Sequence, residues 1–130
     1  MLDDAARAFL QKPLLARMST IDQEGYPHTV PVWFMLEGDD ICIIAVPETK
    51  KVGHIRRNPK GSVSVGGDVN DGGGYLIKGD FAVEDDPGGA FMRKITFHYE
   101  EPETAAKHVE DWKDLGIQTI RLKVKRVLKV

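Results

Sequence analysis

The residues whose types and spacing most clearly suggest a binding site form one short corner, Thr49-Lys50-Lys51. This corner follows an apolar run and opens a predicted helix. Thr49 is a favourable helix N-cap, so both lysines fall in the first helical turn. Cations are disfavoured there because a helix N-terminus is already electropositive. An anion between them removes this conflict, since backbone N–H groups, a hydroxyl and ammonium groups together form a phosphate cradle. The alternative is that both lysines are solvated and that Glu48 partly compensates their charge.

A second stretch, Thr29 to Phe34, has the composition to hold a flat ligand. Pro31 leaves a carbonyl group of the neighbouring strand without its ladder partner, and Trp33 and Phe34 add aromatic surface. A planar ring can lie against such a backbone and hydrogen-bond to it. The alternative is that Trp33 and Phe34 are core residues, and we expect this for at least one of them.

The remaining reactive side chains form no recognisable site. The four histidines, His28, His54, His98 and His108, lack metal-ligand spacing, so no metal site is assigned. Cys42 lies in an apolar run and is expected to be a buried small residue. No serine occupies a nucleophile elbow, and Gly72 to Gly74 precede a strand, so they are not a phosphate loop.

Composition limits the class of protein. The 130 residues fit one domain, 1–130, and the net charge of −2 argues against a module built to bind a nucleic-acid backbone. The single cysteine excludes an internal disulfide and suits a reducing compartment. The acidic start, Met1 to Asp4, is unlike a signal peptide, and no apolar run reaches membrane-spanning length. We therefore expect a cytoplasmic protein with no membrane partner.

Apolar periodicity predicts how these segments are positioned. Helices are expected from Asp3 or Asp4 to Leu10, from Thr49 to Asn58, and twice before the last strand. In that last strand Ile120, Leu122, Val124, Leu128 and Val130 are expected to face inward, with Arg126 the one charge in the apolar phase. Six antiparallel strands with short links favour a barrel, which removes exposed sheet edges. The strands are predicted over Leu14 to Ile21, His28 to Leu36, Ile41 to Val46, Ser62 to Val65, Tyr75 to Glu84, and Gln118 to Val130.

In order and spacing the motifs resemble the FMN-binding split-barrel family, which includes pyridoxamine 5′-phosphate oxidase and its flavin- and F420-dependent relatives. The likeness runs from about Leu14 to the final strand, and implies a mainly β fold with α: a six-stranded antiparallel split β-barrel with short peripheral helices. It rests on Thr20-x-Asp22-x-x-Gly25-x-Pro27, Val30 to Phe34, Thr49 to Lys51, Arg57-Asn58-Pro59 and Gly79.

The resemblance also implies a site. The corner Thr49 to Lys51 matches the family's phosphate-binding Ser-Arg-Lys, and Thr29 to Phe34 and Ile44-Ala45 match two strands that contact the cofactor. The family further implies a homodimer with two cofactors at the interface, and Gly74 near a side chain from the partner. The implied cofactor-binding residues are Thr29, Val30, Pro31, Val32, Trp33, Ile44, Ala45, Thr49, Lys50, Lys51 and Gly74.

The sequence departs from the oxidases proper in three respects. Thr29 replaces an arginine, Gly74 replaces a glutamine, and the arginine- and tryptophan-bearing tail that binds pyridoxal phosphate is missing. True pyridoxamine phosphate oxidase activity is therefore not expected. The short length and Pro31 to Phe34 look more like the F420- or FMN-using branch.

Three functions follow as hypotheses. The first is an oxidoreductase that uses FMN, or alternatively F420, on a small unsaturated or planar substrate, with no catalytic residue assigned because the cofactor carries the hydride chemistry. The second is a non-enzymatic protein that sequesters flavin or haem on the same barrel, with a histidine as axial ligand for haem. The third and weakest is partner or nucleic-acid binding by the basic last strand. FMN and F420 both present a phosphate and a flat tricyclic ring, so the sequence does not separate them.

Overall fold

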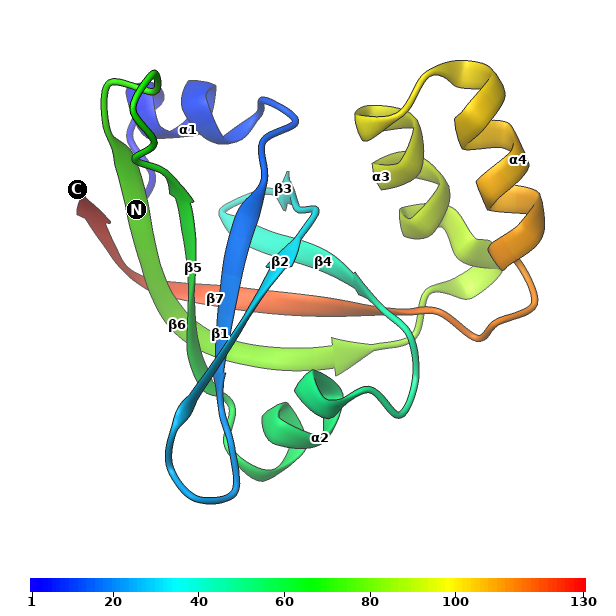
Figure 1. Cartoon of the computed structure of the whole chain (residues 1–130), viewed down its shortest axis with the longest axis horizontal. Coiled ribbons are helices and arrows are strands. Elements are labelled where there is room, and N and C mark those ends of the chain that lie inside the picture. The colour runs from blue at the N-terminus through cyan, green and yellow to red at the C-terminus, as the bar shows by residue number, and fades with distance from the viewer.

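The computed structural model describes all 130 residues, Met1–Val130, and its centre is one antiparallel sheet of seven strands (Figure 1). The strand order is β2-β1-β5-β6-β7-β4-β3, and the two edges do not pair with each other. The predicted mainly β split barrel is confirmed, but the predicted count of six strands is wrong. The strands are β1 (Ala16–Ile21), β2 (Pro27–Val32), β3 (Met35–Glu37), β4 (Asp40–Ala45), β5 (Lys60–Gly66), β6 (Gly74–Glu84) and β7 (Gln118–Lys129).

The additional strand arises because the predicted strand from His28 to Leu36 is divided. β2 ends at Val32 and β3 begins at Met35, and these two strands are the opposite edges of the sheet. The chain therefore crosses the open side of the barrel at Trp33 and Phe34, which we call the seam. Pro31 lies in an edge strand, where a missing N–H group removes no bond from the sheet interior.

The helices lie around the sheet (Figure 1). α2 contacts β1 and β6, whereas α3 contacts α4, β4 and β7 at one end of the barrel. None of the helices combines the length and apolarity needed to span a membrane. Their bounds are α1 (Asp4–Leu10), α2 (Lys50–Arg57), the 3-10 helix η1 (Pro87–Gly89), α3 (Ala90–Tyr99) and α4 (Pro102–Trp112).

The side chains of the barrel interior form one core of 19 buried residues, and a smaller cluster lies under α3. Phe34 is fully buried in the main core, so one of the two seam aromatics is a core residue, as expected. The smaller cluster contains Cys42, Phe91 and Ile95, with Trp33 packed against it. Cys42 is buried as predicted, and burial raises the pKa of its thiol to about 12.

A β-bulge changes the inward face of β7. Lys78 pairs with Arg126, but the next residue of β6, Gly79, pairs with Val124, so β7 carries one extra residue there. One extra residue reverses the alternation of side chains. Val127 therefore packs against the core, and the prediction that Leu128 and Val130 face inward is wrong.

Candidate functional site

A largely apolar cavity of about 380 Å³ lies beside the seam, between β2, β4 and the start of α2. Its walls come from segments far apart in the chain, which the sheet brings together. Lys51 is the one charged residue among them. The lining residues are Leu15, Pro31, Val32, Trp33, Ile43, Ile44, Val46 and Lys51.

The local sequence explains why both β2 and β4 contribute side chains to the cavity wall. The apolar run of β4 places Ile43 in the core and leaves Ile44 half-buried beside the cavity. Along β2, Val32 is buried whereas Pro31 is exposed, as the two-residue period of a strand requires. Trp33, released from strand pairing, is half-buried and forms another part of the wall.

The corner before α2 has an unusual backbone. Glu48 is the only non-glycine residue with a positive φ, 67°, in the chain. Such a conformation is uncommon outside glycine, and strained residues of this kind cluster at functional sites. Thr49 has the extended N-cap conformation, but its hydroxyl donates to the Val46 carbonyl oxygen at 3.0 Å. No side chain therefore caps the first turn of α2, and its N–H groups remain available to an anion.

The two lysines of the corner diverge. Successive helical residues point about 100° apart, because a turn contains 3.6 residues. Lys51 is half-buried at the cavity, joins none of the ion pairs of the protein, and has a pKa lowered by burial. Lys50 is exposed and lines a separate, wholly polar cavity with His28, His54 and Arg57.

The structure brings together only part of the predicted site. Pro31, Val32, Trp33, Ile44 and Lys51 line the cavity, and Thr49 is close by in the chain. The other predicted residues, which do not line it, are Thr29, Val30, Ala45, Lys50 and Gly74.

Each residue outside the cavity has another environment. Thr29 is exposed, and its hydroxyl lies 2.9 Å from that of Ser19. Val30 and Ala45 belong to or pack against the main core. Gly74 pairs with Gly66 and Val130 at the start of β6, where a Cβ atom would overlap the carbonyl oxygen of Val65.

Three lining residues were not predicted: Leu15, Ile43 and Val46. Leu15 and Val46 are apolar and about half exposed, at 50% and 47%. The sequence signal for Leu15 and Val46 was weak, because single exposed aliphatic residues are common on protein surfaces and do not by themselves indicate a binding site.

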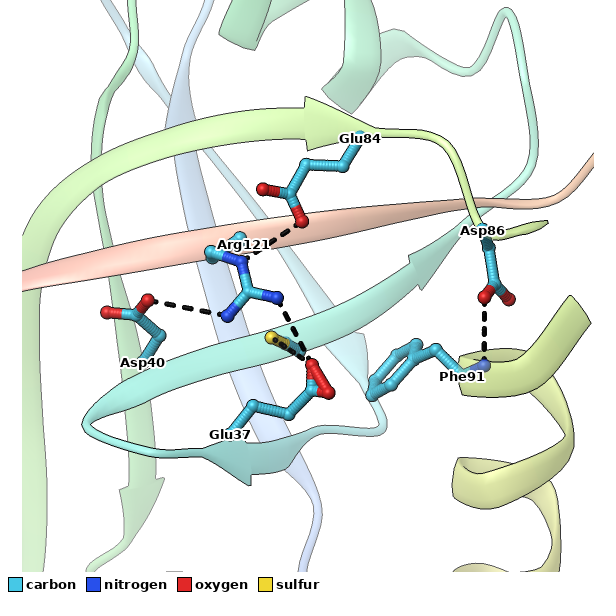
Figure 2. Close-up of polar contacts among 7 residues, drawn as sticks. Glu37, Asp40, Glu84, Asp86, Phe91 and Arg121 are labelled. Carbon is cyan, nitrogen blue, oxygen red and sulfur yellow. Dashed lines mark hydrogen bonds and ion pairs between the residues drawn. The ribbon is translucent and has the colours of Figure 1, made fainter.

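A charged cluster centred on β7 shares only strand β4 with the cavity (Figure 2). The Arg121 guanidinium on β7 bonds Glu84 at 3.0 Å, Glu37 at 3.1 Å and Asp40 at 3.4 Å. Burial opposes charge on this side chain, but the hydrogen bond with Glu84 and the surrounding carboxylates raise its pKa. The cluster joins β3, β4, β6 and β7, and its cation is fully satisfied within the chain.

An antiparallel barrel open at one seam, with an apolar cavity and a free cationic helix start beside it, is a split-barrel protein with a site suited to an anionic, partly apolar ligand. The sequence model of the family described as pyridoxamine 5′-phosphate oxidase matches residues 2–128. The chain belongs to this family, as its motifs indicated.

Known structures share the fold over the whole chain. An F420 reductase superposes with a TM-score of 0.79 at 21% identity, covering 97% of this chain and 98% of that one. A conserved hypothetical protein from Mycobacterium tuberculosis superposes with a TM-score of 0.77 at 17% sequence identity, and the match covers 99% of this chain and 84% of that one. A candidate pyridoxamine 5′-phosphate oxidase from Listeria innocua superposes with a TM-score of 0.78 at 18% sequence identity, and the match covers 100% of this chain and 98% of that one. Among curated proteins, no sequence matches this chain significantly.

Proposed function

We propose that this protein binds a flavin-type cofactor, FMN or F420, and acts as an oxidoreductase on a small planar or unsaturated substrate. The observation that carries the proposal is Lys51, a half-buried ammonium group without a carboxylate partner beside an apolar cavity. A desolvated, unpaired charge costs free energy in the free protein. An anionic ligand at this point offsets that cost.

The residues fit both parts of such a cofactor. The cavity volume of about 380 Å³ lies in the range of ligand pockets, and Pro31, Trp33 and Ile44 offer apolar walls to a flat ring. Lys51 and the uncapped first turn of α2 offer a cation and N–H donors to a phosphate. The structure named as an F420 reductase and the family match support the same assignment.

The cofactor, when bound, supplies hydride transfer, and the chain supplies binding, orientation and exclusion of water. Lys51 holds the phosphate, while Trp33 and Ile44 shield the ring from solvent. No carboxylate or imidazole lines the cavity, so within one chain no other group is placed to move a proton there.

We also propose a homodimer in which a second copy covers the cavity. Leu15, Val46 and Pro31 leave an apolar, partly exposed rim around it. The resemblance implies a cofactor that touches both chains, which suits a cavity open on this side. Light scattering coupled to size exclusion tests this state. A cytoplasmic location remains a prediction from the sequence.

The haem-binding alternative receives less support from the cavity. An axial ligand to haem iron is His, Cys, Met or Tyr, and none of these lines the cavity. His28 and His54 line the polar cavity on the other side of α2, and His98 lines one formed with α1 and β3. The flavin-type cofactor is therefore the better fit.

The binding test compares two neighbouring lysines. Fluorescence titration with FMN and with F420 measures Kd for the wild type, Lys51→Met and Lys50→Met. We expect the first variant to weaken binding at least about tenfold, since a charge-assisted contact to phosphate is lost, and the second to change it less than about twofold. Equal losses, or a larger loss for Lys50→Met, would place the phosphate elsewhere.

The activity test follows oxidation of the reduced cofactor by a planar quinone such as menadione, with and without the protein. The proposal expects turnover that falls in Lys51→Met as cofactor binding falls. Wild-type protein that takes up neither FMN nor F420 contradicts the proposed function, and binding without any turnover leaves only the sequestering role.

A further inference from the structure

The seam leaves backbone groups that no strand pairs. Phe34 lies between β2 and β3 and is fully buried, so its N–H and carbonyl groups need other partners. One side chain from α3 provides them. The Tyr99 hydroxyl accepts from the Phe34 N–H at 3.0 Å and lies 3.1 Å from the Phe34 carbonyl oxygen.

The same hydroxyl reaches a second segment. It shares its single proton between the carbonyl oxygen of Leu14 at 2.7 Å, just before β1, and the more distant Phe34 carbonyl oxygen. Leu14 and Phe34 are the immediate neighbours of Leu15 and Trp33, which both line the cavity. Burial raises the pKa of Tyr99, so the hydroxyl keeps its proton at neutral pH and remains a donor.

The ring of Tyr99 acts on the cavity wall directly. It stacks on the indole of Trp33 with centroids 4.9 Å apart and an interplanar angle of 8°. Trp33 and Ile44 pack against the cluster of Cys42, Phe91 and Ile95, so α3 supports two wall residues from behind. A stacked, supported indole has already lost the rotamer freedom that ligand binding would otherwise remove.

We propose that Tyr99 is a positioning residue, which fixes Trp33 and Leu15 as preformed walls of the cavity. This rests on the proposed function for the identity of the ligand, but not for the state of Trp33 in the free protein. Tyr99 thereby makes α3 part of the ligand site, although Tyr99 does not itself line the cavity.

The test isolates Trp33. The chain has two tryptophans, so Trp112→Phe leaves Trp33 as the only indole. In that background we compare Tyr99→Phe, which removes the hydroxyl, with Tyr99→Ala, which also removes the stack. Tyr75→Phe is the matched control, because Tyr75 is a buried tyrosine of the main core. Acrylamide quenching and anisotropy of Trp33 are measured without ligand, and Kd for FMN and F420 afterwards.

We expect quenching of Trp33 to rise in the order control, Tyr99→Phe, Tyr99→Ala. We also expect Kd to rise about three- to tenfold in Tyr99→Ala, as ordering one large side chain requires, and less in Tyr99→Phe. If Tyr99→Ala does not fold, Tyr99→Phe alone decides the outcome against Tyr75→Phe.

Quenching and Kd equal to those of the control, in folded variants, would overturn the positioning role. A wild type that binds neither cofactor contradicts the proposed function only. In that case the quenching of Trp33 in the free protein still decides whether Tyr99 fixes the wall.

Discussion

Two partly buried cations of this protein have opposite surroundings. The Arg121 side chain is 21% exposed and has three carboxylate partners, Glu37, Asp40 and Glu84 (Figure 2). Lys51 is also half-buried, but it faces a cavity whose other walls carry no charge.

The difference separates a charge held within the structure, that of Arg121, from a charge that we propose to bind a ligand, that of Lys51. Removing Arg121 would leave three carboxylates close together on three strands, whereas removing Lys51 would leave no group without its partner. Arg121 variants should therefore change stability and Lys51 variants should change binding.

The largest expected effect tests the structural half of this comparison. Arg121→Met should lower the free energy of unfolding by about 2 to 3 kcal/mol, because like charges lose their common partner in a partly shielded site. Urea denaturation measures this loss, and cofactor Kd per folded molecule should stay within about twofold. The control is Arg7→Met, which removes an exposed ion pair with Asp39 and should cost less than about 1 kcal/mol. Equal losses would remove the special status of Arg121.

The second prediction concerns the pH dependence of binding. Burial lowers the pKa of Lys51 in the free protein, and a bound phosphate raises it again. Kd should therefore increase as pH rises through the lowered pKa, because the free protein must then take up a proton to bind. Lys51→Arg should bind with a flat profile over the same range, since guanidinium does not deprotonate. A wild-type profile as flat as that of Lys51→Arg would argue against a phosphate at this lysine.

The third prediction measures the effect of Lys51 on stability, for comparison with that of Arg121. Lys51→Met should leave the stability of the free protein unchanged or raise it by about 0.5 kcal/mol, because it removes a desolvated charge that has no partner. The urea midpoint of the free protein measures this. A clear loss of stability would show that Lys51 has a structural partner after all.

The smallest effect belongs to a third titratable group, on the other side of α2. Burial and the neighbouring His28 lower the pKa of His54, whose Nδ1 lies 2.9 Å from the Thr20 hydroxyl. Below about pH 6.5 the unfolded chain binds a proton that the folded chain does not, so stability should fall on acidification. The urea midpoint should be lower at about pH 5.5 than at about pH 7.5, and less so in His54→Asn. An undiminished difference in the variant would assign the effect to other groups.

The sequence was sufficient for the family, most elements and part of the site. Lys51, Pro31 and Trp33 were predicted from local patterns and Ile44 from the family resemblance, and all four line one cavity. Sequence patterns miss what depends on distant contacts. Tyr99 bonds Phe34 across 65 positions, and nothing in the local pattern of α3 indicates it.

Other differences between the sequence predictions and the structure arise from the geometry of single residues. A corner motif treats Lys50 and Lys51 as a pair, but the helical turn directs them to separate cavities. The division of the strand at Trp33 follows from which strands are edges, and the alternation of a single segment does not contain that information.

The place of β7 has a consequence for the order in which the protein assembles during synthesis. β7 is the last strand in the sequence, yet it lies between β6 and β4 and alone joins the block β2-β1-β5-β6 to the hairpin β4-β3. A nascent chain that has not yet exposed β7 holds two blocks that the seam connects but no strand pairing joins, one carrying Pro31 and the other Ile44. The cavity draws on both, so we expect it to be completed only after β7 leaves the ribosome, and the proposed cofactor to bind after translation of that strand.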